Sequence, residues 1–147
     1  MKTVIFDWKQ TLYDPDKKAL INGAVEVLEF LKDEKVPMVL IGKGSHDMHA
    51  EVKRLGVKDY FKHINFREGP KDPSLYSSFV KKRAPKETIF VGDRVRSELA
   101  VGNSLGTTTI WIKQGEFASE EPENPMEQPA YSFRSLRELK EFFEVFV

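Results

Sequence analysis

Two aspartates of this chain stand directly after short apolar runs. Asp7 ends the stretch VIFD, and Asp93 ends the stretch TIFVGD, with Glu98 adding a third carboxylate shortly afterwards. Carboxylates that lie close together repel one another unless a cation lies between them. Magnesium suits such a place because it prefers oxygen ligands and keeps several of its waters. If the two aspartates meet in the fold, they predict a Mg²⁺ site.

Two lysines and a serine add groups that bind anions. Lys43 and Ser45 follow the apolar stretch PMVLIG, and Lys71 precedes a helical pattern. A lysine ammonium supplies a point charge for an anionic group, and a serine at a helix start, with free backbone N–H groups, suits phosphate. An ionised aspartate that attacks phosphorus forms an aspartyl-phosphate. The set therefore indicates phosphoryl transfer from a phosphorylated substrate rather than proton or hydride transfer.

The elements that must position these residues alternate along the chain. Strands are predicted at residues 4–6, 37–41, 63–66, 88–91 and 107–112. Helices are predicted at residues 24–32, 45–55, 73–83, 97–105 and 135–146, and Ser45 is expected to cap the second of them. This alternation indicates an α/β layered domain with a mainly parallel sheet. Since ligands bind beyond the carboxyl ends of parallel strands, the candidate residues are expected to converge on one crevice.

Length and composition restrict the class of protein. The chain has 147 residues, 40% of them hydrophobic, which suits a single domain over residues 1–147. It has no cysteine, which excludes disulfides, thiol nucleophiles and cysteine metal sites. Its formal net charge of zero gives no specific signal for nucleic-acid binding. We expect no membrane span, since no apolar run is long enough, and a cytoplasmic location, since the first residues do not resemble a signal peptide.

One acidic segment, residues 114–130, stands apart from this alternating pattern. It holds five Glu and three Pro, and it is long for a connection without structure of its own. Two interpretations stay open for it: a mobile acidic surface loop, or a flap or subunit contact. The sequence is therefore also compatible with a homo-oligomer.

These residues together resemble the haloacid dehalogenase-like (HAD) hydrolase superfamily, whose members are mostly phosphatases with an aspartate nucleophile. VIFDWKQTLYD is similar to the first motif, with Asp7 at the place of the nucleophile. PMVLIGKGS resembles the second, phosphate-binding motif, and GPKDPSLY holds Lys71 at the place of the third-motif lysine. TIFVGDRVRSE is similar to the fourth motif, with Asp93 and Glu98 at the places of its acidic residues.

The resemblance carries expectations about fold and metal. It implies a three-layer Rossmann-like domain with a central sheet of five or six strands, and the intervals between the motifs leave no room for a cap domain. It implies that Mg²⁺ is bound by Asp7, Asp93, Glu98 and the backbone carbonyl of Lys9. It also implies that Lys71 binds the phosphate and acts with Asp7 in catalysis.

Two of the four motifs depart from the family pattern. At the place of Lys9 the family's phosphatases have an aspartate, which protonates the leaving oxygen and then activates water, whereas a lysine is a poor general base at neutral pH. The second motif normally has Thr or Ser at the strand end, where this chain most simply has Gly42. Ser45 and Lys43 are then the candidates to bind the phosphate in its place. Trp8, beside the nucleophile, is interpreted as a core residue rather than as a wall for substrate.

These departures leave three functions open. The favoured one is a magnesium-dependent phosphatase that works through an aspartyl-phosphate at Asp7, slowly, with Lys9 either orienting the substrate or acting as an acid. The second is a catalytically degenerate protein that binds a phosphorylated ligand or a protein partner. The third, a metal-free dehalogenase-type displacement at carbon, is disfavoured because the chain lacks room for a cap and because WKQT lacks the tyrosine-glycine pattern of the family's dehalogenases.

Overall fold

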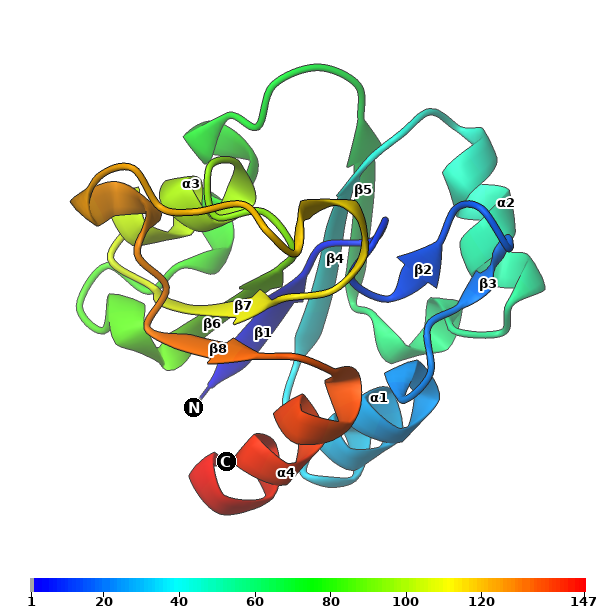
Figure 1. Cartoon of the computed structure of the whole chain (residues 1–147). Coiled ribbons are helices and arrows are strands. Elements are labelled where there is room, and N and C mark those ends of the chain that lie inside the picture. The colour runs from blue at the N-terminus through cyan, green and yellow to red at the C-terminus, as the bar shows by residue number, and fades with distance from the viewer. Residues whose placement is uncertain (1) are drawn as a thin grey trace.

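Six parallel strands form the central sheet of the computed structural model, which describes residues 2–147 (Figure 1). The strand order is β5-β4-β1-β6-β7-β8, and every neighbouring pair is parallel. The strands are β1 (Thr3–Phe6), β4 (Met38–Lys43), β5 (His63–Arg67), β6 (Thr88–Gly92), β7 (Thr108–Ile112) and β8 (Tyr131–Phe133). The order reverses at β1, between β4 and β6. In open α/β sheets, ligands bind at such a switch point.

Helices cover both faces of this sheet and so give the molecule three layers. The helices are α1 (Ala24–Asp33), α2 (Asp47–Arg54), α3 (Glu98–Ser104) and α4 (Leu136–Phe146). Buried side chains of α1, α2 and α4 share one apolar cluster with Val4 and Phe6 of β1. On the opposite face, Ile5 of β1 and Tyr76 pack in a second cluster, to which α3 contributes Val101. The three-layer Rossmann-like α/β fold predicted from the sequence is therefore confirmed.

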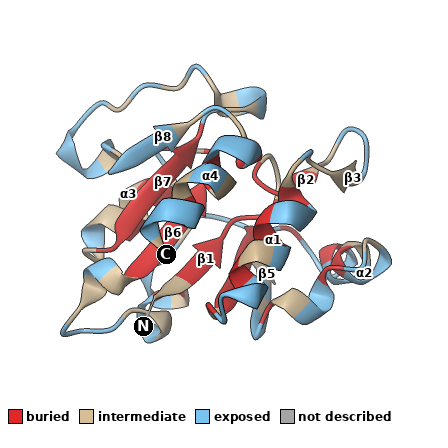
Figure 2. Cartoon of the chain, turned by 90° about the horizontal axis from the view of Figure 1, so that it is seen from below, coloured by how far each residue is buried: buried red, intermediate tan, exposed pale blue. Residues whose placement is uncertain are grey.

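The sequences of the central strands are continuous apolar runs because both faces of these strands are covered by other parts of the chain. Figure 2 shows the buried residues gathered in the strands and the exposed residues on the outer sides of the helices. Val4, Ile5 and Phe6 are all fully buried, although successive side chains of β1 point to opposite faces. Within residues 2–147, no helix combines the length and the apolarity that a bilayer crossing requires.

Residues 73–83 do not form the predicted helix. Two short 3₁₀ turns, at Pro73–Leu75 and Ser77–Phe79, take its place. The first of them is capped by Asp72, whose carboxylate accepts the Ser74 N–H at 2.9 Å. Asp and Ser favour such turns over helix interiors because their side chains compete for backbone hydrogen bonds. Further 3₁₀ turns lie at Lys58–Tyr60, Pro85–Glu87, Gly115–Phe117 and Pro125–Glu127.

Strand β4 is longer than predicted, and the chain leaves it differently. Gly42 and Lys43 pair with β5, so they belong to the strand and do not terminate it. Helix α2 begins at Asp47, and no side chain caps its N-terminus. The predicted Ser45 cap is wrong because the Ser45 hydroxyl donates to the Asp47 carboxylate instead.

A small hairpin that the sequence pattern did not predict follows β1. It consists of β2 (Tyr13–Asp14) and β3 (Ala19–Leu20), which pair antiparallel. Trp8 is fully buried beside it and stacks on Tyr13, with 5.0 Å between the ring centroids. The core position predicted for Trp8 is therefore confirmed. Between β1 and β4 the chain forms only this hairpin and α1.

The acidic segment, residues 114–130, is fastened to the rest of the molecule at both ends. The Gln114 side-chain amide donates to the backbone carbonyls of Gln10 and Thr11, at 3.3 and 3.1 Å. Asn103 of α3 donates two hydrogen bonds of 2.7 Å to backbone carbonyls near the other end of the segment. In Figure 1 the segment, in yellow and orange, passes along the upper edge of the sheet. This path favours the flap interpretation of the segment.

Candidate active site

Asp7 lies at the carboxyl end of β1, at the switch point of the sheet. Its backbone N–H donates to the Val91 carbonyl of β6 at 3.0 Å, which continues the pairing of the two strands by one residue. Its side chain is buried, and it lines a cleft of about 620 Å³. The cleft lies where the sequence predicted that the candidate residues converge.

A buried cluster of three carboxylates gathers beside this position. Oxygen atoms of Asp7, Asp93 and Glu98 all lie within 4.8 Å of one another. Glu98 is the first residue of α3, and its Oε1 accepts the backbone N–H groups of Asp93 and Arg94 at 3.0 and 3.1 Å. Gly92 makes this close approach feasible, because a Cβ there would lie 2.6 Å from Glu98 Oε1. The three acidic residues predicted as metal ligands are thus brought together.

Burial and repulsion from neighbouring carboxylates disfavour the ionised forms of Asp93 and Glu98. Burial raises the pKa of Asp93 and of Glu98, and the nearby Asp7 carboxylate raises both pKa values further. A cation bound among the three groups would relieve this repulsion. Carboxylate oxygens at this spacing match the ligand chemistry of Mg²⁺.

Lys71 is the basic residue that contacts the aspartate at the strand end. Its Nζ lies 3.4 Å from Asp7 Oδ1, and both side chains are about nine-tenths buried. Burial alone lowers the pKa of Lys71, but the Asp7 carboxylate opposes this effect and the net pKa is raised. Lys71 therefore stays charged and can share an anionic group with Asp7.

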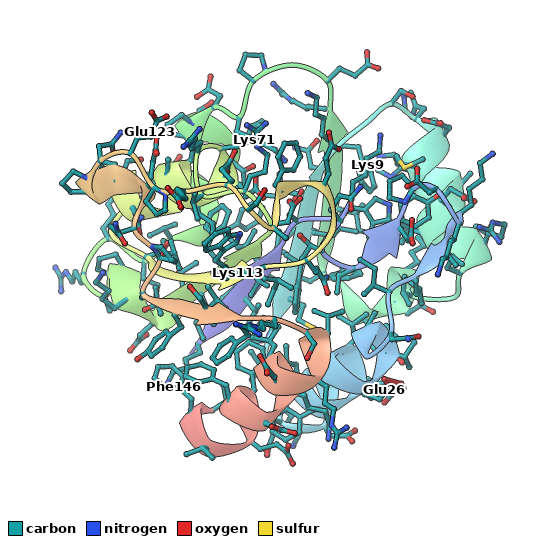
Figure 3. The ribbon with its side chains drawn as sticks, in the orientation of Figure 1. Lys9, Glu26, Lys71, Lys113, Glu123 and Phe146 are labelled. Carbon is teal, nitrogen blue, oxygen red and sulfur yellow. The ribbon has the colours of Figure 1, made fainter. Side chains whose placement is uncertain are left out.

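Lys9 also lines the cleft but does not pair with Asp7. Among the residues that the structure describes, no carboxylate forms an ion pair with the Lys9 ammonium. Its Nζ lies toward the end of β4, 3.9 Å from the place that a Cβ on Gly44 would occupy. Figure 3 shows Lys9 on the α2 side of the molecule, apart from Lys71. The Lys9 ammonium therefore does not neutralise Asp7.

The predicted phosphate-binding stretch after β4 is brought only partly into the cleft. Lys43 is exposed and lines the cleft. Gly42 and Ser45 are not among the lining residues. A Cβ on Gly42 would lie 2.8 Å from both Trp8 Cβ and Phe66 Cε1, so the packing excludes a hydroxyl-bearing side chain there.

We expect Gly42→Ser to destabilise the protein by about 1–3 kcal/mol, because Trp8 and Phe66 leave no space for the added atoms. Urea denaturation would measure the change in the free energy of unfolding. Ala50→Ser, at an exposed position of α2, serves as the control and should cost less than about 1 kcal/mol. A Gly42→Ser protein as stable as the wild type would contradict this account of the missing hydroxyl.

Several further residues line the cleft that sequence reasoning did not single out. They include Gln10, Pro15, Arg94, Glu116 and Phe117. The Arg94 guanidinium lies 4.1 Å from the centroid of the Phe117 ring and pairs with a glutamate of the acidic segment at 3.1 Å. Arg94 could have been suspected from its place directly after Asp93. Nothing in the local sequence marks Phe117, which reaches the cleft only because of how the acidic segment folds back.

Comparison with known proteins agrees with this arrangement of residues. The HAD-hydrolase-like family model matches residues 69–139, which include Lys71, Asp93 and Glu98. A glyceraldehyde 3-phosphate phosphatase of Pyrococcus furiosus is 30% identical over 132 residues, covering 85% of this chain and 53% of that protein. Over the matched regions, the chain is similar in sequence to HAD-like hydrolases. A second glyceraldehyde 3-phosphate phosphatase, from Methanopyrus kandleri, is 26% identical over 92 residues, covering 58% of this chain and 40% of that protein.

Solved structures share this fold over nearly the whole chain, among them a HAD-superfamily hydrolase from Ehrlichia chaffeensis with a TM-score of 0.73 at 16% identity, over 100% of both chains. An uncharacterized protein from Listeria monocytogenes serotype 4b superposes with a TM-score of 0.79 at 19% identity, over 99% of this chain and 98% of that one. By contrast, this HAD-like chain spans about half the length, or less, of the two glyceraldehyde 3-phosphate phosphatases.

Proposed function

We propose that the chain is a magnesium-dependent phosphatase in which Asp7 is the nucleophile. One observation carries this proposal: Asp7 is held between the Lys71 ammonium and the carboxylates of Asp93 and Glu98, at the end of the central strand. The relatives named as phosphatases support the same reaction class. Phosphate release from a generic aryl phosphate, compared between the wild type and Asp7→Asn, tests it.

The proposed reaction has two steps at the phosphorus atom. In the first, a carboxylate oxygen of Asp7 attacks phosphorus, the bond to the ester oxygen breaks, and an aspartyl-phosphate forms. In the second, water attacks the same phosphorus, the bond to Asp7 breaks, and inorganic phosphate leaves while Asp7 is restored. Lys71 offsets the negative charge of the phosphoryl group in both steps, since its ammonium already lies beside Asp7.

Asp7, Asp93, Glu98 and the Lys9 backbone carbonyl are the proposed ligands of Mg²⁺. The fit rests on the three buried carboxylates, which have oxygens within reach of one ion. Among residues 2–147, Lys71 is the one cation that forms an ion pair with any of them. When bound, Mg²⁺ would supply positive charge that draws the phosphoryl oxygens toward Asp7 and offsets their repulsion by it. Glu98 would also help to position Asp93, because the Glu98 carboxylate accepts the backbone N–H of Asp93.

Lys9 makes the proposed phosphatase a slow one. General acid–base assistance is typically worth about 10²–10⁴ in rate, and Lys9 replaces the residue that would give it. The leaving oxygen must then take its proton from solvent water. This same departure favours the second candidate function, a degenerate protein that binds a phosphorylated ligand or a protein partner with little turnover.

The proposed substrate is a phosphate monoester whose size the structure limits only loosely. Between β1 and β4 the chain has only a hairpin and a helix, so in this chain the cleft is bordered by short segments. Glyceraldehyde 3-phosphate, from the names of the relatives, is one substrate to assay. A chain without a cap could also accept a larger phosphorylated molecule, or use a second copy of itself as a lid.

Mg²⁺ is expected to raise the melting temperature more at about pH 8 than at about pH 5. Because the pKa values of Asp93 and Glu98 are raised in the folded state, Glu98 to about 7, the metal-free folded protein holds extra protons. The stability that they give is full below the ordinary carboxyl pKa of about 4 and is lost as the pH rises through the folded-state values. Mg²⁺ binds ionised carboxylates. The rise in melting temperature that it causes therefore grows as the pH increases over the same range.

Thermal unfolding with and without Mg²⁺ at both pH values measures this effect. Asp93→Asn should lose most of the shift, whereas Asp59→Asn, at an exposed turn far from the cleft, should keep it. An equal Mg²⁺ shift at the two pH values would contradict binding at the carboxylate cluster.

A further inference from the structure

The two sides of the cleft differ in charge. On the side of β6 lie Asp93 and Glu98, which are buried carboxylates. On the side of β4 lie Lys43, the last residue of that strand, and Lys9, whose Nζ extends toward the next residue, Gly44. Asp7 stands between them on β1, because β1 is flanked by β4 and β6. The buried carboxylates thus lie on the β6 side of Asp7, with Arg94 beside them, and Lys9 and Lys43 lie on the β4 side.

The two lysines on the β4 side are not used elsewhere in the described part of the chain. Neither the Lys9 nor the Lys43 ammonium forms an ion pair with a carboxylate. Lys71, by contrast, lies against Asp7, and Arg94 pairs with Glu120. Two like charges that share one side of a cleft repel each other, and an anion between them removes this cost. The pair is thus available to a ligand.

Three neutral groups that could bind a phosphate at the end of β4 are occupied or missing. The Gly44 N–H donates to the Arg67 carbonyl at 3.0 Å. The Ser45 hydroxyl donates to Asp47, and the space beside Gly42 is filled by Trp8 and Phe66. The side chains that the β4 side contributes to the cleft are therefore two long, adaptable lysines. Flexible lysine side chains suit an anionic group whose position is fixed by the binding of another part of the substrate.

We propose that Lys9 and Lys43 form a subsite for a second anionic group on the substrate, separate from the phosphoryl group that reacts at Asp7. The inference rests on the proposed phosphatase function, in which Asp7, Lys71 and the metal ligands hold the reacting phosphoryl group. The cleft, with a volume of about 620 Å³, has room for an organic part that joins the two anions. The substrate class is thus a small organic phosphate that also bears a carboxylate or another phosphate.

Matched substrates that differ only in one charge test this subsite. We would compare kcat/KM for a short series of carboxyalkyl phosphates of increasing chain length with that for the corresponding carboxamides. The wild type is expected to prefer the best carboxylate by about five- to tenfold over its amide. Lys43→Met and Lys9→Met should each bring this ratio toward unity. Lys62→Met, an exposed lysine at the opposite end of β4, should leave the ratio as it is.

Two results would overturn the inference. One is a wild type without preference for the carboxylate at any chain length. The other is an equal loss of kcat/KM for carboxylate and amide in the lysine variants, which would assign both lysines to the reacting phosphate.

A binding measurement separates this inference from the proposed catalytic function. The carboxyalkyl phosphonates and their amides cannot be hydrolysed, so their effect on the melting temperature in Mg²⁺ reports binding alone. A larger shift with the carboxylates, lost in Lys43→Met, supports the subsite even if Asp7→Asn proves that no turnover depends on Asp7. Equal shifts with both ligands would sink the subsite even if Asp7-dependent turnover is found.

Discussion

Asp7→Asn lowers the release of phosphate from an aryl phosphate by about 10³-fold or more, if Asp7 is the nucleophile. The asparagine side chain has nearly the same shape and still fits the buried position at the end of β1. Its amide oxygen is neutral and does not form the phosphoryl-enzyme bond. The assay is phosphate release in Mg²⁺ with wild type and variant purified side by side.

The substitution also removes the charge that faces Lys71, so loss of activity needs a second observation. Acid quenching during turnover, followed by peptide mass analysis, should find the phosphoryl group on Asp7 in the wild type and nowhere in Asp7→Asn. Asp59→Asn changes the same chemical group at an exposed turn and should retain full activity. Equal rates for the wild type and Asp7→Asn would remove Asp7 from the mechanism.

The sequence predicted best the positions of the residues that directly follow strands of the sheet. Asp7 and Asp93 each follow a buried apolar strand, and parallel strands end at the same edge. Adjacent strands β1 and β6 then bring the two carboxylates together with little freedom. Local pattern was enough here because strand position follows from the apolar runs themselves.

The prediction of local backbone structure was less accurate where a polar side chain has several possible hydrogen-bond partners nearby. Ser45 was expected to accept a helix N–H, but its hydroxyl donates to Asp47. The helix predicted over residues 73–83 is replaced by two 3₁₀ turns, one of which begins at the side chain of Asp72. In each case one hydrogen bond of a short polar side chain determines the local backbone conformation. The pattern of apolar residues does not predict this hydrogen bond.

Long-range packing explains what sequence reasoning missed around the cleft. Phe117 reaches the cleft because the segment after β7 returns across the strand ends, where Gln114 is bound to the loop after Asp7. The direction of Lys9 depends on the same loop. Trp8 is buried on one side of it, and the Lys9 ammonium lies toward Gly44 instead of Asp7. Neither arrangement follows from residue types near it in sequence.

The direction of Lys9 bears directly on whether the site can turn over substrate. A lysine two residues after Asp7 could have formed an ion pair with this proposed nucleophile and lowered its reactivity. In this fold the ion pair of Asp7 is with Lys71 alone among the residues described. In the proposed mechanism the site therefore lacks a proton-transfer group, but the Asp7 carboxylate is not masked by Lys9.

Lys9→Asp is accordingly expected to raise the rate of aryl phosphate hydrolysis by about 10²-fold, the lower end of what general acid–base assistance gives. A carboxyl group at this position would protonate the leaving ester oxygen and then take a proton from the attacking water. Position 9 lines the cleft, so a side chain there is placed to reach the reacting group. The assay should use an ester without a second anionic group, so that lost charge at position 9 is not confused with lost proton transfer.

Lys9→Met separates the two changes that Lys9→Asp makes. Both variants remove the ammonium, but only the aspartate adds a group that transfers protons. A gain in Lys9→Asp that is absent in Lys9→Met means that the native site is slow because it lacks an acid and base. A loss of activity in both variants would instead give the ammonium a positive role in turnover, and would reject the interpretation of this chain as a degenerate binding protein.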